Sequence, residues 1–243
     1  MRVLFYKEIK EFFNSVTGYL VVIIFLLINS MFMWIFKGGF NVFDIGFANL
    51  DTLFIISPWV FLFLVPAITM NVFSGEIRTG TIELLLTRPL SELQIVMAKY
   101  LASVILVLIA LVPTLFYLVS INYLADPVGN VDYGAIFGSY IGLFFLAAIY
   151  SAIGVFASSL TSNSVIAFLL SVLFCYVFFL GFDNLAQLTL SGKVSDFVIS
   201  LGINDHYRSM SRGVIDTRDV IYFLSVISIF IFLTKLRLES RKW

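Results

Sequence analysis

The sequence is poor in the residues that most often build catalytic and metal sites. It has one cysteine, Cys175, and one histidine, His206, among 243 residues. A lone cysteine cannot form an intrachain disulfide, and Cys175 lies in an apolar run, where we expect a buried structural role. A lone histidine cannot supply the paired groups of most hydrolases, and there is no HExxH, GxSxG or GxxxxGK[ST] pattern. We therefore expect no catalytic residue, no metal, no bound cofactor and no ATP hydrolysis by the chain itself.

Charged residues are also scarce. They make up 12% of the chain and hydrophobic residues 60%, whereas soluble domains average about 25% and about 45 to 50%. The formal net charge is zero, so the composition does not suggest a nucleic-acid partner. The excess apolar residues lie in long runs, which is the pattern of a chain surrounded by membrane lipid. We predict an all-α, polytopic membrane protein.

Long apolar runs define the expected membrane spans. A hydrocarbon core of about 30 Å needs about 20 helical residues. Six runs in a single domain, 1–243, meet or approach that length. They lie near residues 18–36, 53–73, 95–121, 136–158, 165–182 and 220–236. We expect no charged residue or histidine in the interior of a span, which disfavours an ion-coupled carrier.

Basic residues indicate the orientation of the spans. Three lie in the N-terminal tail, three in residues 74–99 and four in the tail from Lys235, so ten of the fifteen fall on one side. By the positive-inside rule, both termini are predicted to be cytoplasmic. The first run is long and lacks a small-residue cleavage site, so we expect a retained helix and not a signal peptide.

Residues 75–92, GEIRTGTIELLLTRPLSE, contain turn and helix signals that an irregular loop would lack. Gly80 allows a sharp turn, Thr81 can cap a helix, and Glu83 would lie in its first turn. That helix should end before Pro89, because a residue preceding proline disfavours helical geometry. It would carry both apolar and charged surface. The residues alone leave two uses open, which are docking into a partner protein and lying on lipid headgroups.

The same residues resemble the signature loop of ABC-2 type permeases. The resemblance rests on the order Glu76, Gly80, Thr81, Glu83, Leu84 to Leu86, Pro89 and Lys99. It implies the type V exporter-like permease fold and a coupling helix, residues 76–88, that docks into a cytoplasmic ATP-binding subunit, which would hold ATP and Mg. The implied interface residues are Glu76, Arg78, Gly80, Thr81, Glu83, Leu84, Leu85 and Arg88. It also implies a second permease subunit, identical or different.

A narrower resemblance comes from SRGVIDTRDVIYF, residues 211–223, and from TRP at 87–89. Together they are similar to the GldF-like permeases of bacterial gliding motility. This similarity implies a bacterial inner (plasma) membrane protein, a larger permease-like partner with an outer domain, and export or conformational work driven by ATP. The alternative is a non-transporting scaffold that transmits ATPase strokes to other envelope proteins.

For several other polar and small residues, two interpretations remain open. Asn29, Ser57, Thr69 and Asn71 could face a transport pathway or form polar contacts between helices. The four-residue spacing of Gly134, Gly138 and Gly142 predicts close helix packing, more often within the subunit than in a dimer. The inner loop 158–163 could touch the ATPase or simply connect two spans.

The outer segment 183–219 mixes apolar and charged residues, which predicts short helices half-buried at the membrane interface. The family resemblance suggests a cap over the pathway. The segment contains His206, Arg208 and Arg212. We expect these three to be solvated or interfacial and not catalytic.

Overall fold

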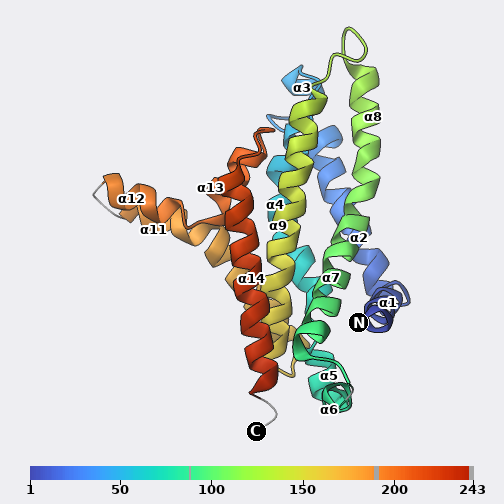
Figure 1. Cartoon of the computed structure of the whole chain (residues 1–243). Helices are drawn as coiled ribbons and strands as arrows, with labels where there is room; N and C mark the ends of the chain where they lie inside the picture. The colour runs from blue at the N-terminus through green and yellow to red at the C-terminus, as the bar shows by residue number, and fades with distance from the viewer. Residues whose placement is uncertain (88, 189–191, 241–243) are drawn as a thin grey trace.

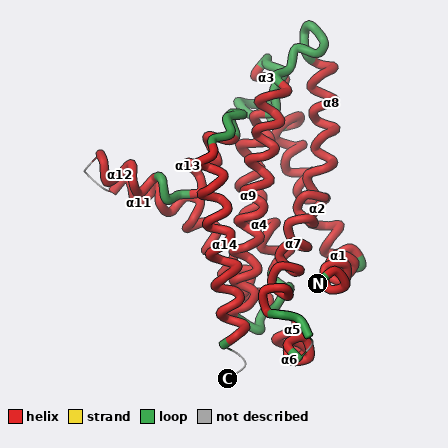
Figure 2. The backbone as a smooth tube through the Cα atoms, in the orientation of Figure 1, coloured by secondary structure: helices red, strands yellow, loops and turns green. Residues whose placement is uncertain are grey.

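The structure is a computed structural model that describes residues 1–87, 89–188 and 192–240. The described residues contain helices and no strand, with 81% of the residues helical (Figures 1 and 2). Six helical segments in these ranges are long and apolar enough to cross a membrane: Val16–Ile35, Asp51–Thr79, Glu92–Leu124, Tyr133–Leu160, Ser164–Leu188 and Thr217–Glu239. The prediction of an all-α protein with six spans is confirmed.

Two helices form the centre of the bundle, namely α4 (Asp51–Thr69) and α9 (Tyr133–Leu160). The apolar windows of these two spans are 72% and 78% buried, against 22% to 39% in the other four. α9 contacts α4, α7 (Glu92–Leu111), α10 (Ser164–Tyr176) and α14 (Thr217–Glu239), while α2 (Val16–Ser30) lies against α4. Small residues allow this close packing: a Cβ on Gly154 of α9 would lie 2.1 Å from Thr69 Oγ1 of α4.

The third span begins earlier than predicted and is interrupted. α7 begins at Glu92 because Ser91 and Gln94 form a capping box, in which each side chain accepts from the other's backbone N–H. The span then passes through η2 (Val112–Thr114), a 3-10 turn, before α8 (Leu115–Leu124). Pro113 lies in that turn and cannot donate an α-helical hydrogen bond.

The first span ends in a single π-helical turn, η1 (Met31–Ile35), and the fifth contains another, η3 (Val177–Gly181).

The N-terminus and the end of α14 lie at one end of the bundle (Figure 1). The same end carries α1 (Arg2–Phe13), α5 (Ser74–Thr79) and α6 (Thr81–Leu86). We call it the inner end. The N-terminal stretch, expected only as a basic tail, is an amphipathic helix that contacts α7.

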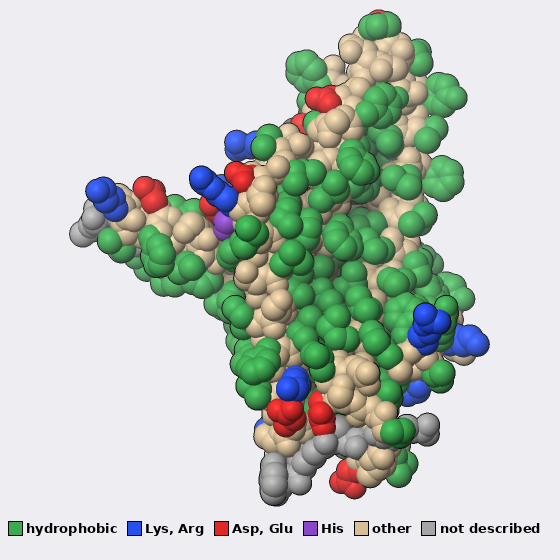
Figure 3. Space-filling model, viewed as in Figure 1, with side chains coloured by type: hydrophobic (Ala, Val, Ile, Leu, Met, Phe, Trp, Pro, Cys, Tyr) green, Lys and Arg blue, Asp and Glu red, His purple; other side chains and the backbone are tan. Residues whose placement is uncertain are grey.

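The opposite, outer part of the bundle carries α3 (Val42–Ile45) and three short helices, of which the first ends the fifth candidate span and the other two precede the sixth. These are α11 (Phe182–Leu188), α12 (Gly192–Ile199) and α13 (Ile203–Met210). α11 and α12 contact each other and form an arm that leaves the bundle sideways (Figures 1 and 2). Hydrophobic side chains cover one edge of the arm and charged side chains the other (Figure 3). Such a face is typical of helices at a membrane interface.

Candidate functional site

The predicted coupling loop consists of two short helices joined at a sharp turn. α5 ends at Thr79 and α6 begins at Thr81, and Gly80 between them has φ 72°. That left-handed conformation favours glycine. The side chain of Thr81 does not cap α6, because Gly80 occupies the capping position and Thr81 is the first helical residue. The Thr81 hydroxyl instead lies 2.9 Å from that of Thr79.

α6 has one anchored face and one exposed face. Ile82 is 5% exposed and packs in an apolar cluster at the inner end, together with Leu4 of α1, Val96 of α7 and Leu238 of α14. Leu84 on the other face is 68% exposed. Thr81 and Glu83 are also exposed, and Leu85 is half-buried. The predicted interface residue Arg88 lies outside the described residues. The exposed face of α6 thus lies at the end of the bundle, on a helix that is anchored by Ile82 (Figure 1).

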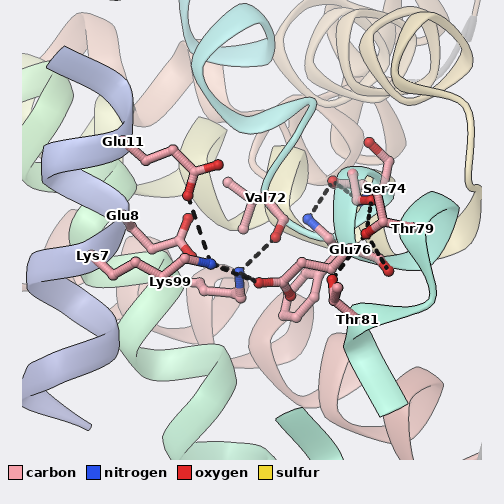
Figure 4. Close-up of polar contacts among 12 residues, drawn as sticks. Lys7, Glu8, Glu11, Val72, Ser74, Glu76, Thr79, Thr81 and Lys99 are labelled. Atoms are coloured by element: carbon pink, nitrogen blue, oxygen red, sulfur yellow. Dashed lines mark hydrogen bonds and ion pairs between the residues drawn. The ribbon is translucent and has the colours of Figure 1, made fainter. Parts of the chain in front are cut away.

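Lys99 joins three elements beneath this loop (Figure 4). Its Nζ donates to Glu8 Oε1 of α1 at 2.7 Å, to the carbonyl oxygen of Val72 at 2.7 Å, and to Glu76 Oε1 of α5 at 3.0 Å. The ammonium also lies 5.1 Å from the ring centroid of Phe73. The Lys99 side chain is 1% exposed, so this charge depends on its partners for solvation. We call Glu8, Glu76 and Lys99 the inner ion cluster.

Lys7 extends the inner ion cluster toward solvent. Its Nζ lies 3.4 Å from Glu76 Oε1 and 3.7 Å from Glu11 Oε2. Partial burial acts to lower the pKa of Lys7, but the carboxylates of Glu76, Glu8 and Glu11 outweigh it and raise the pKa above its ordinary value. α1 is therefore bound to the coupling loop by charge as well as by apolar contact.

Ser158, at the end of α9, organises the turn that leads from α4 into α5. Its Oγ accepts from the backbone N–H of Phe73 at 3.0 Å and of Ser74 at 3.1 Å, and it donates to the Met70 carbonyl oxygen at 3.0 Å. The hydroxyl thus satisfies two N–H groups at the start of α5 and one carbonyl at the end of α4, which are backbone groups that helix ends leave without helical partners. Residues 158–160 of the predicted inner loop belong to α9, and Ser158 makes the contact with the base of the coupling loop.

The family model described as "ABC-2 family transporter protein" matches residues 3–243. The chain belongs to the ABC-2 transporter family. No match was found among curated proteins. ABC-2 permeases are membrane components and are not themselves catalytic, and they generally dimerise and work with an ATP-binding subunit.

In this ABC-2 permease, one expectation about charge is wrong. From the sequence, Lys99 is expected to be a loop cation, and no charge is expected inside a span. Lys99 instead lies two turns into α7 and is buried. A hydropathy run starting at residue 95 already includes it, but only the tertiary structure shows that Glu8 and Glu76 compensate its charge. Glu8 and Ser158 carry no sequence signal that would identify them as partners of the coupling loop.

The four proposed pathway residues do not gather around one cavity. Asn29 and Ser57 are buried between α2 and α4, and Ser57 Oγ donates to Asn29 Oδ1 at 3.4 Å. Thr69 is buried elsewhere in the bundle and donates to the Val65 carbonyl at 2.9 Å. Asn71 is exposed and lines a separate cavity of about 180 Å³ near α1 and α7. A role in transport for these residues stays a prediction.

The glycines of α9 differ from one another in their surroundings. A Cβ on Gly138 would lie 2.7 Å from Gly213 Cα, and one on Gly142 would lie 2.9 Å from Met210 Cβ. These two positions let the end of α13 approach α9 within the same chain. Gly134 is exposed, and a Cβ there would meet only Asp132.

The outer histidine of the permease ties the short helices to the last span. His206 Nδ1 lies 2.7 Å from Asp219 Oδ1 of α14, and Nε2 lies 2.9 Å from the Ser200 carbonyl oxygen. The imidazole stacks on the ring of Tyr222 with centroids 3.9 Å apart. Among the described residues, no group of three or more potential metal ligands surrounds it.

Proposed function

We propose that this ABC-2 permease subunit is driven by a separate cytoplasmic ATP-binding subunit that docks on α5 and α6. The observation that carries the proposal is the exposed face of α6, with Leu84 at its centre, on a helix anchored by Ile82. An exposed leucine beside Thr81 and Glu83 suits a protein groove with an apolar floor and a polar rim. In the proposed orientation the inner end faces the cytoplasm, with both termini.

The inner ion cluster supports a route for the motion. Lys99 connects the coupling loop to α7 and α1 through short, charge-assisted hydrogen bonds. Ser158 connects the same loop to α9, the central helix. A push on α6 would therefore move α1, α7 and α9 together and not bend a loose loop. We propose that ATP binding and hydrolysis in the partner switch the bundle by this rigid connection.

The complete transporter requires a second permease subunit, which we propose to be a larger gliding-associated permease in the bacterial inner membrane. The similarity of residues 211–223 and 87–89 to GldF-like permeases supports this choice. The proposed work is ATP-driven export in gliding motility. Deleting the gene in a gliding bacterium should abolish gliding while growth continues. Normal gliding would remove the motility assignment.

Docking is tested by copurification with the ATP-binding subunit and by stimulation of its ATPase activity. Leu84→Asp and Glu83→Lys should lower both, because each changes the exposed face of α6 without touching its anchor. Val128→Asp is a matched control, since Val128 is 67% exposed at the outer end. Undiminished binding and stimulation in the α6 variants would refute the docking site. A reconstituted complex that couples but moves no solute would favour the mechanical scaffold.

A further inference from the structure

The outer end of the protein contains a cavity of about 770 Å³. It lies between the outer half of α4, the first two turns of α9, η3 and one face of α13. A cavity of this size can hold a ligand of about drug size, or the headgroup region and upper chains of a lipid. It lies at the end of the bundle opposite the inner ion cluster, and the proposed docking of an ATPase does not use it.

The walls of this cavity change from polar to apolar along α4. Asp51 lies at the outer start of the helix, and Ile55, Pro58 and Trp59 follow inward. Eight residues of helix from Asp51 to Trp59 span about 12 Å. Ile55 and Trp59 are 53% and 49% exposed, so the apolar part of the cavity is open at the side of the bundle and not only at its end. A ligand entering from the membrane would meet this side.

Two arginines line the polar part of the cavity. Arg208 and Arg212 are both exposed, and neither makes an ion pair or a side-chain hydrogen bond within the described ranges of the chain. The two acidic residues of the lining bond to neutral groups and not to the arginines: Asp51 Oδ2 accepts from Asn49 at 2.7 Å, and Asp132 Oδ1 accepts from the Ala135 N–H at 3.0 Å. The guanidinium groups are therefore available to an anion. Arginine suits phosphate because its planar donors can bind two oxygens at once.

The arm formed by α11 and α12 indicates the depth of the cavity in the bilayer. Phe179 and Leu180 line the cavity and lie immediately before the start of α11 at Phe182. The arm leaves the bundle at this level with one hydrophobic edge and one charged edge (Figure 3). An arm of this kind lies in the plane of the membrane interface. An arm at the interface would place the arginines toward the lipid phosphates and Trp59 toward the acyl chains.

We propose that this outer cavity binds a phospholipid of the surrounding outer leaflet, with its phosphate on Arg208 and Arg212 and an acyl chain along Ile55 and Trp59. The polarity of the walls runs in the same direction as that of a lipid molecule. The side opening favours a lipid over a water-soluble phosphate. The site requires only the folded permease subunit, so the lipid proposal can be tested independently of ATPase docking.

The test measures lipid retention by the purified full chain in detergent, using native mass spectrometry. Phosphatidylglycerol is compared with diacylglycerol of the same chains, which lacks the phosphate, and with glycerol phosphate, which lacks the chains. Retention of phosphatidylglycerol by R208Q/R212Q should fall about tenfold or more, since a hydrogen bond to a charged group contributes about a factor of ten. R218Q is the matched control, because Arg218 is an exposed arginine at the outer end that does not line the cavity.

Equal retention by R208Q/R212Q and the parent would overturn the proposal, and so would an equal loss in R218Q. If glycerol phosphate competes with the lipid at equal concentration, the ligand is a water-soluble phosphate and not a membrane lipid, which would also overturn the proposal. If R208Q/R212Q does not fold, photo-crosslinking of the parent with a diazirine phospholipid decides the question. Labelled peptides should contain α13 and the outer half of α4. Labelling that spares both would overturn the proposal.

Discussion

The hydroxyl of Tyr207 in α13 donates a hydrogen bond of 2.6 Å to the carbonyl oxygen of Phe54 in α4. This carbonyl lies four residues before Pro58, which has no N–H to supply the usual helical donor. Burial raises the pKa of Tyr207, so the hydroxyl keeps its proton at any physiological pH. The outer helix α13 therefore completes the hydrogen bonding of a central span.

Tyr207→Phe should lower the free energy of unfolding by about 1 to 3 kcal/mol, because it leaves the buried Phe54 carbonyl without a donor. In a Pro58→Ala background the loss should be smaller, since an alanine at that position has a backbone N–H that can donate to Phe54 as in a regular helix. The four proteins of this double-mutant cycle can be compared by unfolding in mixed micelles. An equal loss in both backgrounds would show that Tyr207 does not compensate for Pro58.

Removing the charge of Lys99 should be among the most damaging changes at the inner end. Lys99→Met leaves the carboxylates of Glu8 and Glu76 without their buried partner, which costs about 3 to 5 kcal/mol. The control is Lys235→Met, which removes a partly exposed pair with Glu239 and should cost below about 1 kcal/mol. Similar unfolding midpoints for the two variants would contradict the importance assigned to the inner ion cluster.

Ser158→Ala should destabilise the turn between α4 and α5. Each of the two amides that it leaves without an acceptor, at Phe73 and Ser74, costs about 1 to 3 kcal/mol if no water replaces the hydroxyl. Ser159→Ala is the matched control, because that hydroxyl is equally buried but bonds only to Phe156 of its own helix. Amide hydrogen exchange should rise in residues 73–79 in the first variant alone. Unchanged protection there would refute the role of Ser158.

The docking of α1 should weaken at alkaline pH. Because the folded pKa of Lys7 is raised above 10.5, its contribution is complete below pH 10.5 and is lost as the pH rises through the folded value. The effect should be small, since the side chain is 54% exposed. Melting curves from pH 9 upward should show a loss in the parent that Lys7→Gln reduces and Lys10→Gln leaves unchanged. Identical pH profiles in the parent and the two variants would contradict the role of Lys7 in docking α1.

Elements governed by local sequence were the predictable part of this fold. The six spans follow from long apolar runs, and α6 lies where Gly80 and Pro89 bracket a short helical stretch. α7 begins three residues before the predicted start of the third span, because a capping box extends the helix beyond its apolar run. Such shifts depend on side-chain geometry that a hydropathy window does not include.

The contacts of the candidate site depend on residues far apart in the chain. Lys99 meets Glu8 across 91 positions, and Ser158 meets Phe73 across 85. One sequence does not show which of its 15 acidic residues will compensate a buried lysine. The amphipathic pattern of residues 2–13 is a local signal for α1, whereas its contact with α7 depends on the tertiary structure.

Site-specific photo-crosslinking from residue 84 tests the central claim most directly. A benzophenone amino acid at Leu84, in the centre of the exposed face of α6, should crosslink to the cytoplasmic ATP-binding subunit in intact membranes. The same amino acid at Val128, at the outer end, should not. Crosslinks from residue 84 to lipid alone, with the ATP-binding subunit present and active, would contradict the account.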